Sequence, residues 1–413
     1  MRHTLIIGGG AAGMAAAIAA AKKGDRVTVL ERGRKPLKKL GVTGNGRGNL
    51  LNCGRPEFYG DTAFAMEVLR HMPYEKIAAF LNDCGIPLVH EDEGRMYPSS
   101  FLASSAVDAL RLTADQLNVE SVSNVRAEQI VREKNGFCVK CLRAVYAPDQ
   151  QLKSGRVKAG ALIGEEKCVY RADRVIIAAG GMASPMHGTD GTAYGLLTEH
   201  GHALTELKPA LCALLTETKP LEGLTGQRVR ASLTLKDAQE VSLHQSRGEA
   251  LFADDGVSGI AAMQLARFVQ DGCTLHMDLR MAVTGDENCN VLPWLQRRMQ
   301  RVDDPQKLLI GACTAQLAQA LWRMAGSKPS LGALEALAHA IQNFAVPVTG
   351  TRGFESAQVT AGGLKTDDFD PSTLESRLVP GLYAAGEILN VDGGCGGHNL
   401  MFAFASGLLA GQR

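Results

Sequence analysis

The chain has 413 residues, enough for about two or three domains with sizeable cores. Hydrophobic residues make up 45% and charged residues 21%, the balance of a globular protein, and a net charge of +1 gives no broad field for nucleic acid or an anionic membrane. The ten cysteines have no repeating spacing, so we expect mostly reduced thiols in a cytoplasmic protein. We expect neither a signal peptide nor a membrane span, because the first apolar run is short and is needed as a strand.

The N-terminal pattern predicts a strand at 4–7, an Ala-rich helix at 11–23 and a second strand at 26–30. The motif Gly8-x-Gly10-x-x-Gly13 joins the first strand to the helix, and Glu31 follows the second strand. Such glycines let a pyrophosphate approach the helix N-terminus, and such an acid accepts hydrogen bonds from a ribose diol. We therefore predict a dinucleotide site that suits FAD or NAD better than NADP. The alternative is an ordinary glycine-rich turn with a surface Glu.

A second glycine-rich loop, residues 43–49, reads Thr-Gly-Asn-Gly-Arg-Gly-Asn. Its hydroxyl, amide, guanidinium and backbone N–H donors suit a pyrophosphate or a flavin edge. A loop so rich in glycine is costly to order unless a ligand fixes it, although a plain surface loop is the alternative. The basic cluster at 32–39 precedes it, and for most of that cluster we favour a solvated charge run.

The C-terminal motif begins with a buried strand at 382–385 that delivers Gly386 and Glu387 to the ligand side of a parallel sheet. Gly396 and Gly397 then lead into a final helix, predicted at 399–411. The positive end of that helix could stabilise negative charge on a reduced flavin.

Between these motifs the pattern changes near 202 and again near 345, which predicts an insertion into a dinucleotide-binding fold. Strand patterns dominate the first part of the insertion, and a helical pattern covers about 287–343. We predict an α/β fold divided into an FAD-binding domain (first part, 1–202), an inserted β subdomain (203–286), a small helical subdomain (287–344) and the second part of the FAD-binding domain (345–413). Cys138 and Cys141 lie in a strand-like stretch and are expected to be ordinary thiols.

Together with residues 359–363 (Val-Thr-Ala-Gly-Gly), these motifs resemble the HI0933-like, or BaiN-like, family of FAD-dependent oxidoreductases. These are two-dinucleotide-binding-domain flavoproteins that include aminoacetone oxidase-like proteins. The resemblance spans nearly the whole chain and implies a Rossmann-type, glutathione-reductase-like FAD-binding domain. The chain differs from the family at Gly48, His398 and Met401, where Cys, Tyr and Gln are usual, and it lacks the proline of a Gly-x-Ser-Gly-Pro run at 256–260. The cofactor-binding residues so expected are Gly8, Gly10, Ala12, Gly13, Glu31, Arg32, Thr43, Gly44, Arg47, Asn49, Val125, Ala179, Gly180, Gly386, Glu387, Asp392, Gly397, Asn399 and Leu400.

The resemblance implies FAD as cofactor and hydride transfer through flavin N5, in a cavity that we expect between the FAD domain and the insertion. Only one dinucleotide fingerprint is present, so NADH or NADPH would bind transiently as the electron donor. We expect reduction of a C=C or C=O bond in a small organic substrate, with His398 and Arg47 as candidate catalytic residues and Cys395 and Asn399 nearby; for His398 a structural role is the alternative.

Two alternatives to this reaction stay open. One is a flavin oxidase that passes electrons from a small amine or related metabolite to O₂. The other is a non-catalytic or tRNA-modification-related flavoprotein, against which the near-neutral charge weighs. We expect no metal, nucleic-acid or membrane partner, and the sequence leaves the oligomeric state open.

Overall fold

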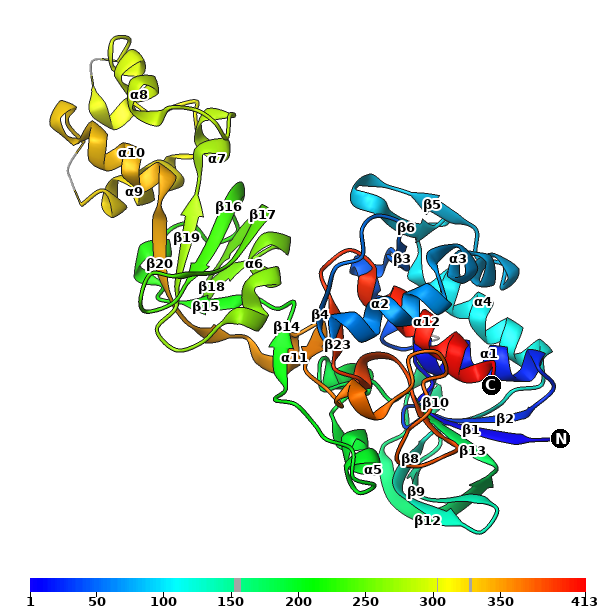
Figure 1. The fold of residues 1–413 in the computed structure, drawn as a ribbon. Helices are drawn as coiled ribbons and strands as arrows, with labels where there is room; N and C mark the ends of the chain where they lie inside the picture. Colours follow the sequence, from blue (N-terminus) through cyan, green and yellow to red (C-terminus); the bar gives the residue numbers. More distant parts are fainter. Residues whose placement is uncertain (152–156, 303, 327–328) are drawn as a thin grey trace. The chain divides into compact units, whose positions relative to one another are not determined.

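The computed structural model describes residues 1–151, 157–302, 304–326 and 329–413. The chain forms two compact units, the first made of residues 1–208 and 359–413 and the second of residues 209–358. The first unit therefore contains both termini, which are blue and red in Figure 1. Among the residues described, no helix is long and apolar enough to cross a membrane.

The core of the first unit is a parallel sheet with the strand order β22–β13–β1–β2–β7. Except for the exposed edge strand β7, the strands are short, mostly apolar runs that are largely buried on both faces, as is usual where other layers cover a parallel sheet. Because the pairs are all parallel, the carboxyl ends of the strands meet at one edge. In sheet order the strands are Leu382–Ala384 (β22), Arg174–Ile177 (β13), His3–Ile7 (β1), Arg26–Leu30 (β2) and Glu120–Val122 (β7).

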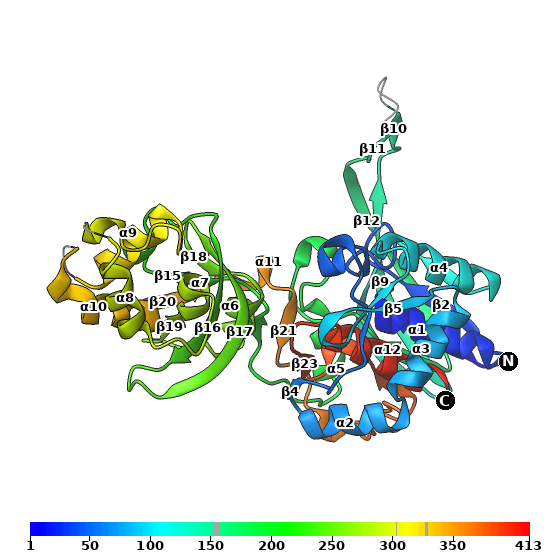
Figure 2. The same ribbon diagram turned by 90° about the horizontal axis from the view of Figure 1, so that it is seen from above.

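Two helices from opposite ends of the chain, α1 (Ala11–Lys22) and α12 (His398–Gly411), lie side by side in this unit (Figures 1 and 2). Their contact is made by small residues. A Cβ on Gly407 would overlap the carbonyl oxygen of Ala12, and one on Gly411 would overlap that of Ala16. Both contacts advance by four residues in the same direction, so the two helices run parallel where they touch.

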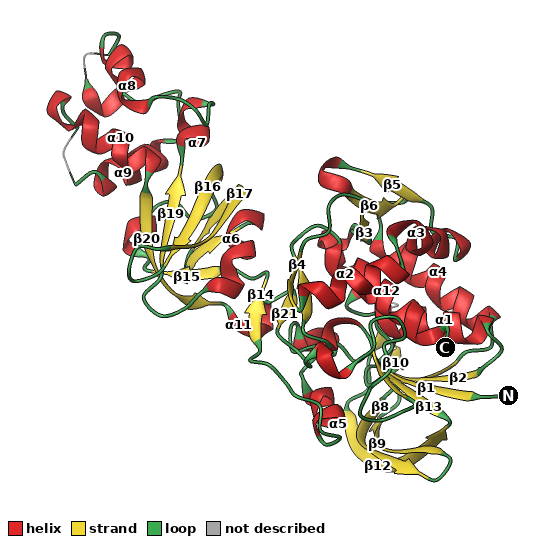
Figure 3. Ribbon diagram, viewed as in Figure 1, coloured by secondary structure: helices red, strands yellow, loops and turns green. Residues whose placement is uncertain are grey.

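The rest of the first unit consists of antiparallel ribbons and further helices, shown by type in Figure 3. A three-stranded sheet of β8, β9 and β12 holds Cys138 and Cys141, which are both buried. None of the ten cysteines forms a disulfide in the described structure. The elements are β8 (Val125–Glu133), β9 (Gly136–Tyr146), β12 (Leu162–Ala172), β3 (Leu51–Asn52), β5 (Leu88–His90), β6 (Arg95–Pro98), β4 (Phe58–Gly60), β23 (Val391–Gly393), α2 (Thr62–His71), α3 (Tyr74–Asp83), α4 (Ala103–Gln116), α5 (Gly195–Thr198) and β21 (Val359–Ala361).

The second unit is built on a closed six-stranded barrel with the order β15–β18–β17–β16–β19–β20. Its core includes Phe252 and Phe344, whose rings meet edge to face with their centres 6.4 Å apart. Helices lie between β19 and β20 in the sequence. The elements are β15 (Leu214–Thr216), β16 (Arg228–Lys236), β17 (Ser242–Ala253), β18 (Gly256–Ser258), α6 (Ile260–Leu265), β19 (Thr274–Asp278), α7 (Arg280–Thr284), α8 (Val291–Met299), α9 (Ala315–Met324), α10 (Leu334–Gln342), β20 (Phe344–Thr351) and α11 (Gly353–Ser356).

The predicted α/β class is confirmed, but the predicted return to the first unit at 345 is wrong. Strand β20 pairs with β15 and β19 and closes the barrel, and the first unit resumes at Val359. Buried and more exposed residues alternate along 344–348. A strand in a barrel and a strand in an open sheet with one covered face both show this alternation, so it does not distinguish them. Periodicity therefore located the strand without identifying the sheet to which it belongs.

Arg174 on β13 ties the end of α12 to the parallel sheet. Its side chain is buried, and Nε donates to Thr4 Oγ1 at 2.7 Å while Nη2 pairs with Asp25 Oδ2 at 3.0 Å. The remaining donors reach the last carbonyls of α12, at Ala410 and Gly411, each at 3.0 Å. A cation suits this position because the C-terminus of a helix carries partial negative charge.

Replacing Arg174 with Met should lower the free energy of unfolding by about 3–5 kcal/mol, because two helix-end carbonyls lose their donor and the buried carboxylate of Asp25 is left with the partly exposed Arg2 as its counter-charge. The matched control is Arg171→Met on β12, since Arg171 is 68% exposed and its ion pair among the described residues is with Glu133. Loss of an exposed pair should cost no more than about 1 kcal/mol. Urea unfolding of the two variants measures the difference, and equal midpoints would contradict the anchoring role of Arg174.

Candidate cofactor site

The turn after β1 is shaped by glycines with different tasks. Gly8 has a φ of +102°, and its N–H donates to the carbonyl of Leu30 at 2.8 Å. A Cβ on Gly13 would overlap the carbonyl oxygen of Gly8, so this glycine lets α1 pack directly on the turn. By contrast, a Cβ on Gly10, the N-cap of α1, would meet no described atom within 4 Å. The space before the helix N-terminus is therefore open, as a bound pyrophosphate requires.

Glu31 is held at the end of β2, next to this turn. Its carboxylate accepts hydrogen bonds from the backbone N–H of Gly9 at 2.9 Å and of Gly33 at 2.6 Å. Its carbonyl accepts from Val125 N at 2.9 Å, which brings the first residue of β8 to the same place. Each carboxylate oxygen keeps a lone pair that can accept from a ribose hydroxyl. Arg32 points elsewhere, into an ion pair with Asp190.

The loop at 43–49 has some side chains on the surface and others that point into the interior. Arg47 is exposed, pairs with Glu91 at 2.6 Å and lies over the rings of Tyr97 and Phe101. Thr43 Oγ1 donates to the carbonyl of Leu40 at 2.8 Å, and Gly44 adopts a left-handed φ of +57°. Asn49 Oδ1 is buried and has no hydrogen-bond partner within the described ranges. A buried acceptor without a partner costs free energy, so Asn49 fits a site whose ligand brings a donor.

Asn49 meets the N-terminus of α12. A Cβ on Gly397, which has a φ of +101°, would overlap the carbonyl of Leu51 and lie 2.9 Å from Asn49 Oδ1. Asn399 closes the loop before the helix by accepting from Gly393 N at 2.7 Å and donating to the carbonyl of Gly393 at 2.8 Å. Two of the predicted motifs are thus brought together at one helix end.

A partly buried network of polar contacts lies at the end of β22. Glu387 accepts from Thr360 N at 2.9 Å and pairs with Lys39 at 2.8 Å, and Thr360 Oγ1 accepts from the N–H groups of Met182 and Ala183. Next to it, Gly386 donates to Ser406 Oγ on α12 at 2.9 Å. Lys39 therefore differs from the solvated charge run that the sequence favoured, since its side chain is only 25% exposed.

The remaining predicted residues lie either around the turn after β1 or near the N-terminal end of α12. Ala179 and Gly180 follow β13 next to Gly8, and Ala12 faces Gly386, so these residues surround the first turn. Asp392 is buried in β23 opposite Tyr59, and Leu400 is half-buried in the first turn of α12. In the described parts of the chain, no cluster of three or more His, Cys, Asp or Glu could hold a metal ion.

Sequence reasoning missed Asn52, Thr360 and Lys39 as individual residues. Asn52 is buried, donates to the carbonyl of Gly396 at 2.8 Å and accepts from Gly54 N at 2.8 Å. An asparagine within an apolar strand pattern, where it is disfavoured, was a signal that could have found it. Lys39 gave no such signal, because its partner Glu387 is remote in the chain.

His398, the first residue of α12, is only 5% exposed and lies edge-on to the ring of Phe58. Burial lowers the pKa of His398, and nearby Glu57 opposes that shift only in part. The imidazole is therefore neutral near pH 7, and its Nδ1 finds no partner in the portion of the chain that is described. Burial also raises the pKa of the Cys395 thiol, which stays protonated.

A phosphate turn at the end of a parallel strand, an acid after the next strand and the N-terminus of a second helix together define an FAD-dependent oxidoreductase with a Rossmann-type FAD-binding domain. The chain belongs to the HI0933-like family, whose Rossmann-domain model matches residues 2–413. The predicted family is confirmed.

Known proteins resemble the chain over almost its whole length. A 3-dehydro-bile acid delta(4,6)-reductase from Clostridium scindens is 32% identical, covering 100% of this chain and 98% of the relative. A ribosomal RNA dihydrouridine synthase from Escherichia coli is 26% identical, covering 99% and 96%. Among solved structures, a 3-ketosteroid delta1-dehydrogenase from Sterolibacterium denitrificans matches with a TM-score of 0.48 and 12% identity, covering 100% of this chain and 99% of that one.

Replacing Gly13 with Val should destabilise the apoprotein by about 3 kcal/mol and abolish FAD retention, because the side chain would displace the carbonyl of Gly8. The matched variant is Gly10→Ala, whose Cβ has space, so it should fold normally and still retain less FAD. Urea unfolding and the flavin absorbance of the purified proteins separate the two effects. Full FAD content in Gly10→Ala would show that the pyrophosphate does not lie at this turn.

The lowered pKa of His398 predicts a pH dependence of stability. Below its unfolded-state pKa of about 6.5, the unfolded chain binds a proton that folded His398 resists, so stability falls as the pH drops until the folded pKa is reached. His398→Gln should therefore lose less stability between pH 7 and pH 5 than the wild type, as measured by urea midpoints. The exposed His90→Gln variant is the control and should keep the wild-type loss. Identical pH profiles for wild type and His398→Gln would contradict this assignment.

Proposed function

We propose that this protein reduces a C=C or C=O bond of a small organic substrate, with NADH or NADPH as electron donor. The observation that carries the proposal is the N-terminal end of α12, where neutral His398 and Gly397 lie next to Asn49 Oδ1, a buried acceptor without a partner among the described residues. FAD, when bound, supplies the two-electron chemistry. The chain contains a single dinucleotide fingerprint, so the nicotinamide would bind weakly and leave before the substrate enters.

Two sets of residues would bind FAD: those around the turn before α1, and those at the N-terminal end of α12. Gly8–Gly13 and the N-terminus of α1 would hold the pyrophosphate, and Glu31 would accept from the adenosine ribose. Asn49 would accept from a donor on the ring system, and the positive end of α12 would favour negative charge next to it. These roles would give partners to Asn49 Oδ1 and His398 Nδ1, two buried polar atoms at this end of α12 that have none among the described residues.

His398 is proposed as the proton donor to the substrate. Its imidazole is mostly neutral at pH 7, so the imidazolium that forms when it takes a proton from solvent would pass that proton to the substrate and return to the neutral form. Arg47 is held by Glu91 on the exposed side of its loop, so we propose that it orients a substrate or nicotinamide rather than transferring a proton. The glycines at 393, 394 and 397 let this loop pack closely against His398, Glu57 and Leu51, which fixes the start of α12.

The relatives support a reductive reaction and also favour a second candidate. The Clostridium scindens relative is named as a reductase of a bile acid, and those from Escherichia coli and Haemophilus influenzae are named as ribosomal RNA dihydrouridine synthases. Reduction of a base in ribosomal RNA is therefore the second candidate function. The net charge of +1 favours a small-molecule substrate, because RNA binding generally relies on excess positive charge.

Anaerobic mixing of the FAD-loaded protein with NADH or NADPH should bleach the flavin absorbance, with a rate that saturates only at high nicotinamide concentration. Subsequent addition of an α,β-unsaturated ketone should restore the absorbance, and His398→Gln should slow this second step by about 10²–10⁴-fold while leaving the first nearly unchanged. Incubation with unmodified ribosomal RNA, followed by mass spectrometry for dihydrouridine, tests the second candidate. If neither nicotinamide bleaches the flavin but a small amine does, an oxidase replaces both.

A further inference from the structure

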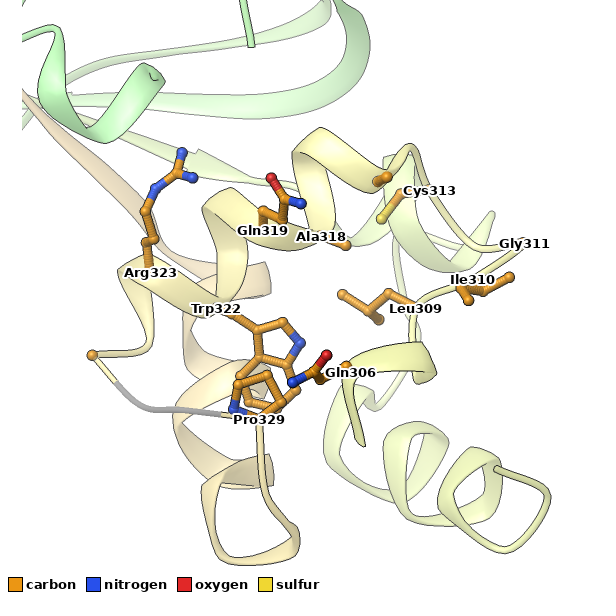
Figure 4. A pocket seen from close by; sticks show the side chains of 12 residues that line it. Gln306, Leu309, Ile310, Gly311, Cys313, Ala318, Gln319, Trp322, Arg323 and Pro329 are labelled. Carbon is orange, nitrogen blue, oxygen red and sulfur yellow. The ribbon is translucent and has the colours of Figure 1, made fainter. Parts of the chain in front are cut away.

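The helical part of the second unit contains a cavity of about 840 Å³ that the proposed reaction does not use. It lies between the turn at Pro305–Lys307, the segment that follows it and one face of α9 (Figure 4). Its volume is within the range of pockets that bind small molecules, about 300–1,000 Å³. Its walls are mostly apolar, with Leu309, Ala318 and Trp322 among them, and the amides of Gln306 and Gln319 add hydrogen-bonding groups.

One wall of this cavity carries an unpaired hydrogen-bond donor. Trp322 is 7% exposed, and its indole Nε1 is buried without a partner among the residues that the structure describes. Figure 4 shows the indole nitrogen facing the side on which Gln306 and Leu309 lie. A buried indole N–H normally finds an acceptor, and leaving it unpaired costs free energy. The cavity therefore favours a ligand that brings an acceptor to this nitrogen.

The surroundings of the indole are uncharged. Leu309 is almost fully buried, and burial raises the pKa of the Cys313 thiol to about 11, so the thiol is not ionised at neutral pH. Arg323 also lines the cavity, but its guanidinium extends away from the indole in Figure 4 and donates to the carbonyl of Glu222. An ionised ligand would have to be desolvated here without a free counter-ion next to the indole, at a considerable cost.

We propose that this cavity binds a flat, uncharged, mainly apolar ring compound whose carbonyl oxygen accepts a hydrogen bond from Trp322 Nε1. Apolar rings match the walls formed by Leu309, Ala318 and Trp322, and the carbonyl supplies the acceptor that the indole lacks. A pure hydrocarbon would fill the space but leave the donor unpaired. The site is separate from the cofactor residues, which all belong to the first unit, and does not depend on the reaction proposed above.

Equilibrium dialysis of the FAD-loaded protein with 9-fluorenone tests the site, and fluorene serves as the matched ligand without the carbonyl. Wild-type protein should bind 9-fluorenone saturably, with one molecule bound per chain in this cavity. Ala318→Phe fills the cavity and should weaken binding at least about tenfold, whereas Gln316→Phe, on the exposed side of the same helix, should leave it unchanged. No saturable binding, or equal binding by Ala318→Phe and wild type, would overturn the proposal.

Trp322→Phe isolates the hydrogen bond, because it keeps an aromatic ring and removes the N–H. The ratio of the dissociation constants of fluorene and 9-fluorenone should fall about three- to tenfold relative to wild type, the usual effect of losing one neutral hydrogen bond. An unchanged ratio would refute the role of the indole. Flavin content and its reduction by NADPH, measured on every variant, should match wild type, so a failure here is distinguishable from a failure of the proposed reaction.

Discussion

The close packing of α1 on α12 is the constraint on which the rest of the first unit depends. Backbone meets backbone where Gly407 lies on Ala12 and Gly411 on Ala16, an approach that no larger side chain would permit. Because the helices run parallel there, both positive ends point toward the edge where the parallel strands end. The glycine turn before α1 and the glycine loop before α12 therefore lie on the same side of the sheet, although they come from opposite ends of the chain, and we propose that both contact the cofactor.

The two ends of α12 differ in whether the buried polar groups there have hydrogen-bond partners. At its C-terminus the last carbonyls are satisfied by Arg174, whose charge is balanced by Asp25. At its N-terminus, Asn49 Oδ1 and His398 Nδ1 are buried without partners in the described structure. Satisfied polar groups stabilise the fold, whereas unsatisfied ones reduce stability and are retained where a ligand completes them. The unpaired indole of Trp322 in the second unit follows the same logic.

The positions at which the chain departs from its family have local structural reasons. Gly48, where the family usually has Cys, adopts a φ of +76°, and a Cβ there would lie 3.0 Å from the backbone of Ala103 at the start of α4. Met401 is buried in α12, where an apolar side chain needs no hydrogen-bond partner. His398, where the family resemblance leads us to expect Tyr, places a smaller ring next to Phe58. Two of these differences fall at the N-terminal end of α12, where we propose that substrate is bound.

The sequence by itself determined the elements whose signals are local. The strands and helix around Gly8–Gly13, the acid at Glu31 and the start of α12 near Gly397 follow from spacing and periodicity over a few residues. Only the tertiary structure decided which sheet each strand joins, as β20 shows, because barrel and open-sheet strands share one alternation. It also decided the pairing of Lys39 with Glu387, the contact of Asn52 with Gly396 and the burial of Trp322. Each of these three features depends on residues that are far apart in the sequence, so neither segment's own hydrophobic periodicity or motifs could predict it.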